Sequence, residues 1–583
     1  MKKALFILLF FVIAQIQAQA QLNAHQYFTQ KNIEVKKAAV VSAHALASDA
    51  GIQVMKQGGN AFDAAIATQF ALAVVYPNAG NLGGGGFMVA HTAKGINIAL
   101  DYRETAPAKA SKDMYLDAAG NPITILSMQG NLASGTPGSV AGILATLKYA
   151  KLPLQKLIAR AITLADKGFA LTANQAASLN SVQDVFLKVN KNKTAFTKNE
   201  PWKAGDILIQ TDLANTLKRI RDNGAKGFYE GQTANLIAAS MQNTNGIITV
   251  EDLKNYKVKP REIMQFKYKE VDVLTMPLPS SGGIILQQLL KIMEQNNLGQ
   301  YPFQSAEGVQ LMVEAERIAF EDRAEFLGDP DFVKVPVEKL VSDDYLKERM
   351  KRFLNNKANK SDKNKGPEEA KVSEQTTHIS IVDAEGNAVS VTTTLNDNYG
   401  SKAVITGAGF IMNNEMDDFS VKPGVPNMYG AIGNEQNAIA PGKTMLSSMT
   451  PTIVLKDGRP IIVVGTPGGT TIPTSVFQSL VNELEYKLSP NDVVNKPKFH
   501  HQWLPDVIFV EKDYPMETRT KLEAMGYKIV ERGSIGKTEM IKIEETIIDL
   551  GPTKPNSKTQ NAKVVKKLTA VADKRGDDDA RGF

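Results

Sequence analysis

The chain has 583 residues, of which 43% are hydrophobic and 22% charged, as is typical of a globular protein with a large core. It contains no cysteine, which excludes disulfides, thiolate metal sites and a cysteine nucleophile. The net charge of +6 is mild and no basic face is interleaved with aromatic residues, so we expect no nucleic-acid partner.

The first 20 residues are predicted to be a secretory signal peptide. Two lysines precede an apolar run, and an Ala-Gln-Ala sequence ends at Ala20, where we expect cleavage. The alternative is an uncleaved membrane anchor, but the apolar run at 4–14 is short beside the roughly 20 residues that a spanning helix needs. We therefore expect no membrane span after signal removal and a periplasmic location, with full secretion left open.

The next segments alternate between helical and extended patterns. Residues 38–75 have apolar spacing typical of helices, interrupted at Gly58-Gly59-Asn60. A glycine run at 83–86, which we interpret as close packing, precedes two alternating segments that are predicted to be strands. Residues 138–320 are predicted to be mostly helical. From residue 376 onward the pattern favours strands, with a helix after the Pro-Gly-Gly turn that ends at Gly469.

A polar, lysine-rich run at 355–371 separates these two parts of the chain. Its composition predicts a flexible linker, which we extend over 355–375. The residues directly after it, 376–395, alternate between apolar and polar positions around a turn at 383–387, which predicts a β-hairpin. A turn centred on Glu385 places Thr376 opposite Thr394, although a glycine bulge could shift this pairing by one residue.

Thr376 is a candidate nucleophile. A threonine hydroxyl inside a chain needs a neighbouring base, and His378, two residues along the same strand, would reach it only awkwardly. If the bond between Gln375 and Thr376 is cut, the new α-amino group, with a reference pKa of about 7.7–8.0, lies on the same residue as the hydroxyl. The alternative is that two threonines simply begin a strand, and the hairpin alone leaves both interpretations open.

Motifs along the whole chain after the signal peptide resemble one family. They include TTHISIVDAEGNAVSVTTTLN from residue 376, NNEMDDFS at 413–420, LSSMTPTIV at 446–454, GTPGG at 465–469, and upstream GGNAFDAAIA at 58–67 and DYRETAP at 101–107. In order and spacing they are similar to the gamma-glutamyltranspeptidases, an N-terminal-nucleophile hydrolase family. The resemblance implies an α+β fold, a four-layer αββα sandwich.

The resemblance also implies that a precursor cuts itself before Thr376. The expected parts are a signal peptide at 1–20, a large subunit at 21–375 that includes the linker 355–375, and a small catalytic subunit at 376–583. The two subunits would form a heterodimer. The cleavage site would be the bond between Gln375 and Thr376.

Site residues follow from the same motif match. Thr394 would orient the nucleophile Thr376, and the N–H groups of Gly468 and Gly469 would bind the oxyanion. The other site residues would bind the two charged groups of the substrate or cover it. Arg103, Ser447 and Ser448 would bind the α-carboxylate, Asn396, Glu415 and Asp418 the α-ammonium, and Tyr429 would be the gate of a lid loop at 423–434. Each also has a simpler structural interpretation, such as a surface arginine, a solvated acidic turn or a tight glycine turn.

The implied activity is cleavage of the γ-glutamyl bond of glutathione and other γ-glutamyl compounds. The glutamyl group would pass through a threonine ester to water, amino acids or dipeptides. No metal or organic cofactor is expected. The rival function within the superfamily is an acylase for glutaryl side chains, which would not need Asp418. A rival of another class is an exported solute-binding protein, which would remain one uncut chain with two matching lobes.

Overall fold

The computed structural model describes residues 21–362, 376–552 and 560–583. The predicted signal peptide, residues 363–374 of the predicted linker and Gln375 lie outside the described residues. In the described part of the chain, no helix is both long and apolar enough to cross a membrane.

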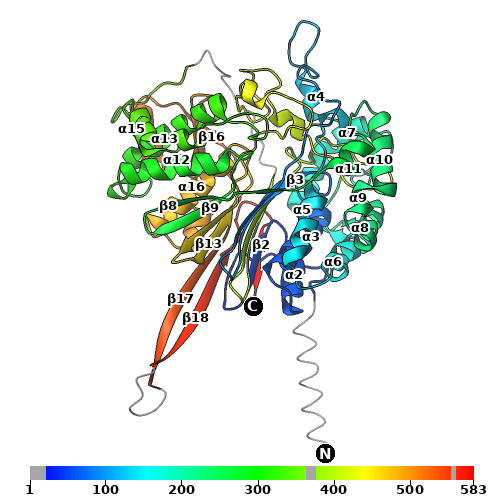
Figure 1. The fold of residues 1–583 in the computed structure, drawn as a ribbon, viewed down its shortest axis with the longest axis horizontal. Helices are drawn as coiled ribbons and strands as arrows, with labels where there is room; N and C mark the ends of the chain where they lie inside the picture. The colour runs from blue at the N-terminus through cyan, green and yellow to red at the C-terminus, as the bar shows by residue number, and fades with distance from the viewer. Residues whose placement is uncertain (1–20, 363–375, 553–559) are drawn as a thin grey trace, which may run out of the picture.

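Two seven-stranded antiparallel sheets stack face to face between two layers of helices (Figure 1). The first sheet has the spatial order β1 (Asn32–Val35), β18 (Gln560–Val571), β17 (Glu539–Pro552), β13 (Arg459–Gly465), β12 (Thr452–Lys456), β9 (Val271–Thr275) and β8 (Met264–Tyr268). The second has the order β19 (Asp579–Gly582), β2 (Ala39–Ser42), β10 (Thr377–Val382), β11 (Ala388–Thr394), β3 (Gly85–His91), β4 (Asn97–Tyr102) and β7 (Lys259–Arg261).

Helices cover the outer face of each sheet (Figure 1). Directly on the second sheet lie α2 (Ala45–Lys56), α3 (Ala61–Val75) and α5 (Ser139–Ala145). The same layer continues with α6 (Leu154–Lys167), which packs on α3, and with α7 (Ala173–Val189), α8 (Thr211–Asn223), α9 (Lys226–Tyr229), α10 (Gly231–Gln242) and α11 (Val250–Asn255). Directly on the first sheet lie α12 (Gly282–Gln295), α16 (Thr471–Leu484) and α17 (Pro490–Asn495). On α12 pack α13 (Ala306–Phe326) and α15 (Asp343–Met350), and α18 (Met516–Ala524) packs on α13.

Apolar side chains from both sheets fill the space between them, among them Val41, Val89, Ile453 and Val463. Burial of this middle layer, and of the two layers under the helices, supplies the main driving force for the arrangement. The predicted α+β fold, a four-layer αββα sandwich, is therefore confirmed.

Short elements complete the fold. They are α4 (Thr124–Met128), α14 (Val337–Leu340), a small sheet of β14 (Phe499–His500), β15 (Ile508–Glu511) and β16 (Ile529–Arg532), and the pair β5 (Phe169–Ala170) and β6 (Ile207–Leu208). The differences from the predicted elements concern strands. The stretch 38–75, predicted to be helical, begins with β2, and the stretch 138–320, expected to be mostly helical, contains β5 to β9. The β17–β18 ribbon, which extends from the body in Figure 1, was not predicted.

Local signals explain how the second sheet is built near the site. Asn60 caps α3 by accepting from the N–H groups of Phe62 and Asp63, so the predicted break between two helices is confirmed. A Cβ on Gly84 would lie 2.1 Å from the carbonyl oxygen of Thr394, which confirms the glycine run as close packing. The closing residues of the chain pair as β19 with β2.

Candidate active site

The hairpin of β10 and β11 places Thr376 directly before the first residue of β10, an interior strand of the second sheet. Thr377 pairs with Thr393 without a bulge, which confirms the predicted register. Thr376 Oγ1 lies 3.3 Å from Thr394 Oγ1, within hydrogen-bond distance, and Thr376 is 5% exposed. In the turn, Asp383 accepts three backbone N–H groups and so fixes the hairpin register.

His378 is part of the core. Its Nδ1 lies 2.8 Å from Thr392 Oγ1 and its Nε2 lies 3.2 Å from Ser380 Oγ. Complete burial lowers the pKa of His378 to about 3, so the ring is neutral at physiological pH. A Cβ on Gly465 would overlap this ring, which shows how tightly it is held. His378 therefore has a structural role and does not serve Thr376 as a base.

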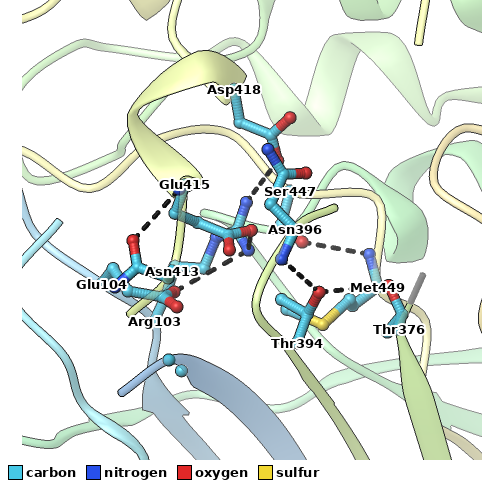
Figure 2. Close-up of polar contacts among 12 residues, drawn as sticks. Arg103, Glu104, Thr376, Thr394, Asn396, Asn413, Glu415, Asp418, Ser447 and Met449 are labelled. Atoms are coloured by element: carbon cyan, nitrogen blue, oxygen red, sulfur yellow. Dashed lines mark hydrogen bonds and ion pairs between the residues drawn. The ribbon is translucent and has the colours of Figure 1, made fainter. Parts of the chain in front are cut away.

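Figure 2 shows Arg103 between two carboxylates beside the paired threonines. Arg103 follows β4, and its Nη2 donates to Asp418 Oδ2 at 2.6 Å while its Nη1 donates to Glu415. Burial lowers the pKa of Arg103, but the Glu415 and Asp418 carboxylates outweigh that effect and raise it overall. Burial raises the pKa of Asp418, and Arg103 opposes the rise. The structure thus brings together three predicted substrate-binding residues as one buried ion-pair cluster.

Glu104 adds a fourth ionisable group to the cluster. Its Oε2 lies 3.9 Å from Arg103 Nη1, and burial raises the pKa of Glu104 to about 8. Asn413 fixes the backbone of the cluster, because its Oδ1 accepts the Glu415 N–H at 3.0 Å. Sequence reasoning did not single out Glu104 or Asn413, although both lie inside the motifs that it used.

The same pocket brings together side chains from distant segments, and we call it the threonine pocket. Its walls include Arg103, Arg323, Thr376, Thr394, Asn396, Glu415, Asp418, Asn427, Tyr429, Ser447, Ser448, Met449 and Gly469. Of the predicted catalytic and substrate-binding residues, Gly468 lies just outside these walls, next to Gly469. Met449 also lines the pocket. The free volume is about 20 Å³, roughly the room of one water molecule.

Gly468 and Gly469 form a sharp turn between β13 and α16. Their φ angles are +138° and +58°, which favour glycine. A Cβ on Gly469 would lie 2.7 Å from the Tyr429 ring. Among the described residues, no acceptor receives a hydrogen bond from either N–H group. Both groups can therefore donate to a ligand.

A loop at 423–434, the predicted lid, covers the threonine pocket. Tyr429 is 7% exposed, and its hydroxyl donates to the Asn396 carbonyl at 2.5 Å. Asn427 links this loop to the ion-pair cluster, because its Nδ2 donates to Asp418 Oδ1 at 3.0 Å and its Oδ1 accepts the N–H groups of Tyr429 and Ala431. Sequence reasoning missed Asn427, since an asparagine in a loop is most often a turn residue.

Asp417 anchors the same loop. Its Oδ1 accepts from the Ser127 hydroxyl at 2.6 Å, and its Oδ2 accepts the Met428 N–H at 2.9 Å. Burial raises the pKa of Asp417 to about 7, while these two hydrogen bonds oppose the rise. The carboxylate therefore ties the loop to α4 through one side chain.

Ser447 and Ser448 lie on the segment before β12. The Ser447 carbonyl accepts from the Ser281 N–H at 2.8 Å, and the Ser447 hydroxyl accepts the Met449 N–H at 3.1 Å. The segment is thus fixed against the N-terminus of α12. No group of three or more His, Cys, Asp or Glu residues suited to hold a metal ion occurs among the described residues.

Comparisons with known proteins agree with this geometry. The family model for gamma-glutamyltranspeptidase matches residues 47–583. The chain is 46% identical to a glutathione hydrolase proenzyme of Escherichia coli (strain K12), over 88% of this chain and 89% of that protein. It is also 34% identical to the acylase ACY 1 proenzyme of Pseudomonas sp. (strain V22), over 84% of this chain and 87% of that one.

A solved structure is also similar to this chain. The gamma-glutamyltranspeptidase of Helicobacter pylori superposes with a TM-score of 0.54 at 43% identity, over 57% of this chain and 94% of that chain. The family match covers both the helical layers and the hairpin that carries Thr376. From its motifs, its fold and these matches, the chain belongs to the gamma-glutamyltranspeptidase family.

Proposed function

We propose that the protein is an autoprocessed threonine enzyme that cleaves the γ-glutamyl bond of glutathione and related compounds. The observation that carries this proposal is the position of Thr376: its hydroxyl faces Thr394 at 3.3 Å, in the same pocket as the Arg103–Glu415–Asp418 cluster. A nucleophile and a site for a charged amino acid group are thus within reach of one small substrate.

The mature enzyme would be a heterodimer made from one precursor. Cleavage after Gln375 gives a large subunit of about 21–375 and a small subunit of 376–583, with removal of residues 1–20 on export to the periplasm. The uncut chain has no free amine at Thr376, because its nitrogen belongs to a peptide bond. Cleavage therefore creates the general base and the active enzyme together.

In the first chemical step, Thr376 Oγ attacks the γ-amide carbonyl of the donor. The Thr376 α-amine takes the hydroxyl proton, and the oxyanion that forms receives hydrogen bonds from Gly468 and Gly469. Collapse of this intermediate breaks the C–N bond, and the α-ammonium returns the proton to the leaving amine. A γ-glutamyl ester of Thr376 remains.

In the second step, water or the amino group of an acceptor attacks the ester. The Thr376 amine removes a proton from the attacking group, and the Thr376 oxygen leaves with that proton. Hydrolysis releases glutamate, and transfer releases a new γ-glutamyl amide. Each step conserves atoms and electrons within the protein, donor and acceptor, and needs no cofactor.

Substrate recognition would rearrange the ion-pair cluster. The donor's α-carboxylate would bind Arg103 with Ser447 and Ser448, and its α-ammonium would bind Asp418 and Glu415, with Asn396 alongside. A guanidinium fork binds a carboxylate through two parallel hydrogen bonds. Because the pocket leaves only about 20 Å³ free, Tyr429 and its loop must move for the donor to enter.

An acylase that takes glutaryl amides is the second candidate, since one relative is named an acylase. A glutaryl group has no α-ammonium, so it leaves Asp418 and Glu415 without a cationic partner from the substrate. The test is hydrolysis of γ-glutamyl-p-nitroanilide against glutaryl-p-nitroanilide by the processed protein. We expect a preference for the γ-glutamyl compound; a preference for the glutaryl compound would overturn the proposal.

A further inference from the structure

Arg323 is a charged residue of the threonine pocket that neither the motifs nor the proposed mechanism uses. It lies in the last turn of α13, lines the pocket, and is 7% exposed. Its Nε donates to Ser281 Oγ at 3.2 Å, and Ser281 Oγ donates to the Ser447 carbonyl at 2.7 Å. Arg323 is therefore connected through one side chain to the serine segment.

The charge of Arg323 lacks a close counterion. Among the described residues, no carboxylate lies within 4.0 Å of its guanidinium, and Asp418 acts on it only at longer range. Burial lowers the pKa of Arg323 to about 10, with Asp418 opposing and Arg103 adding to the decrease, so the side chain stays protonated at neutral pH. A buried cation without a paired anion is costly, and a ligand anion would remove that cost.

The charges of the pocket indicate which anion fits. Arg103 already donates to both Glu415 and Asp418, so this cluster carries more negative than positive charge when both acids are ionised. A zwitterionic amino acid group adds one charge of each sign. With Glu104 protonated, Arg103 and Arg323 balance Glu415 and Asp418, so a zwitterionic group keeps the site neutral whereas a simple anion would leave it with a net negative charge.

We propose that Arg323 binds the α-carboxylate of the γ-glutamyl donor, as a second guanidinium beside Arg103. This assignment rests on the proposed function. Glutathione carries a second carboxylate on its leaving peptide, and this group could also bind a guanidinium. The connection through Ser281 to the serine segment favours the donor side, and the choice of substrates separates the two sources.

The experiment compares Arg323→Gln and Arg323→Lys with the wild type on two donors. γ-Glutamyl-p-nitroanilide has a leaving group without a carboxylate, whereas the leaving dipeptide of glutathione has one. We expect Arg323→Gln to raise KM about 10- to 100-fold on both donors, the range that a hydrogen bond to a charged group supports, with kcat changed little. Arg323→Lys keeps the charge but not the fork and should recover part of the loss.

Other results overturn the assignment. A KM increase on glutathione alone would place Arg323 on the leaving peptide. An unchanged KM on both donors, or a loss confined to kcat, would make it structural. Arg352→Gln is the matched control, since this arginine pairs with Glu321 outside the pocket and should leave both constants unchanged.

Two further readouts keep the test decisive. The N-terminus of the small subunit shows whether each variant is processed normally. Should Arg323→Gln not fold, Ser281→Ala removes the acceptor of Arg323 Nε together with the hydroxyl that donates to the Ser447 carbonyl. This variant should still raise KM on both donors, and an unchanged KM would count against the proposal. If the processed wild type cleaves neither donor, the proposed function itself fails, a result distinct from failure of the Arg323 assignment.

Discussion

Asp418→Asn tests how the threonine pocket recognises a donor. Asp418 Oδ2 lies 2.6 Å from Arg103 Nη2 and its side chain is 15% exposed, so the pair is largely shielded from water. Removal of one partner of a buried pair costs about 3–5 kcal/mol. Glu415 remains in the cluster as a second acidic partner. We therefore expect the loss of the Asp418 carboxylate to cost about 2–4 kcal/mol in binding of the donor's ammonium.

That free energy corresponds to a loss of about 30- to 1,000-fold in kcat/KM for γ-glutamyl-p-nitroanilide. Glutaryl-p-nitroanilide has no ammonium, so its kcat/KM should change little and the preference between the two donors should fall by nearly the full factor. The assay is release of p-nitroaniline by the processed enzyme under initial-rate conditions.

The matched control for this prediction is Asp417→Asn, one residue away in the same turn. The Asp417 carboxylate contacts Ser127 and Met428 rather than Arg103, so the preference between the two donors should not change. An equal loss on both donors for Asp418→Asn would refute the reasoning, because it would mean that Asp418 supports the fold of the pocket and not the ammonium.

Four further predictions follow from single contacts. Arg103→Lys should lower kcat/KM by about 100-fold or more, because an ammonium cannot replace the bidentate fork, while processing at residue 376 continues; intact mass and initial rates check both. Gly469→Ala places a Cβ 2.7 Å from the Tyr429 ring at a φ of +58°, so kcat should fall about 10- to 100-fold, and an unchanged kcat would exclude an oxyanion role for this turn. Tyr429→Phe removes the 2.5 Å hydrogen bond to the Asn396 carbonyl and should loosen the lid, which limited proteolysis of the loop would detect as faster cleavage than in the wild type. Burial raises the pKa of Asp417 from 3.8 to about 7. The contribution of this group to the free energy of unfolding is therefore fully present below pH 4 and is lost as the pH rises to 7, by up to about 4 kcal/mol. Thermal unfolding across pH 4–8 should show the wild type losing stability relative to Asp417→Asn, and parallel curves would contradict this.

The hairpin could be predicted from sequence because its signals are local. Alternating apolar residues and a short turn at Asp383 fix the register, and the register alone places Thr376 opposite Thr394. The break between α2 and α3 was predictable for the same reason, since Asn60 and two glycines act within one turn. Short β8 and β9 were missed among helical segments, because two five-residue strands are weak signals beside long amphipathic helices.

Contacts between distant segments could not be predicted from residue patterns. Arg103 lies 312 residues before Glu415 and 315 before Asp418, and only the stacking of the chain brings them together. Family motifs named these residues but gave no indication that they bind one another in the absence of substrate. Arg323 had no signal at all, since an arginine in a charged helix normally faces solvent. Only the burial of Arg323 in the wall of the threonine pocket reveals it.

The most direct measurement is the intact mass and N-terminal sequence of the purified wild-type protein beside Thr376→Ala. We expect the wild type to yield two chains, one of which begins at Thr376, and the variant to remain one uncut and inactive chain. A wild type that stays a single chain, or normal subunits from Thr376→Ala, would contradict the proposal that Thr376 cuts the precursor and then performs the reaction.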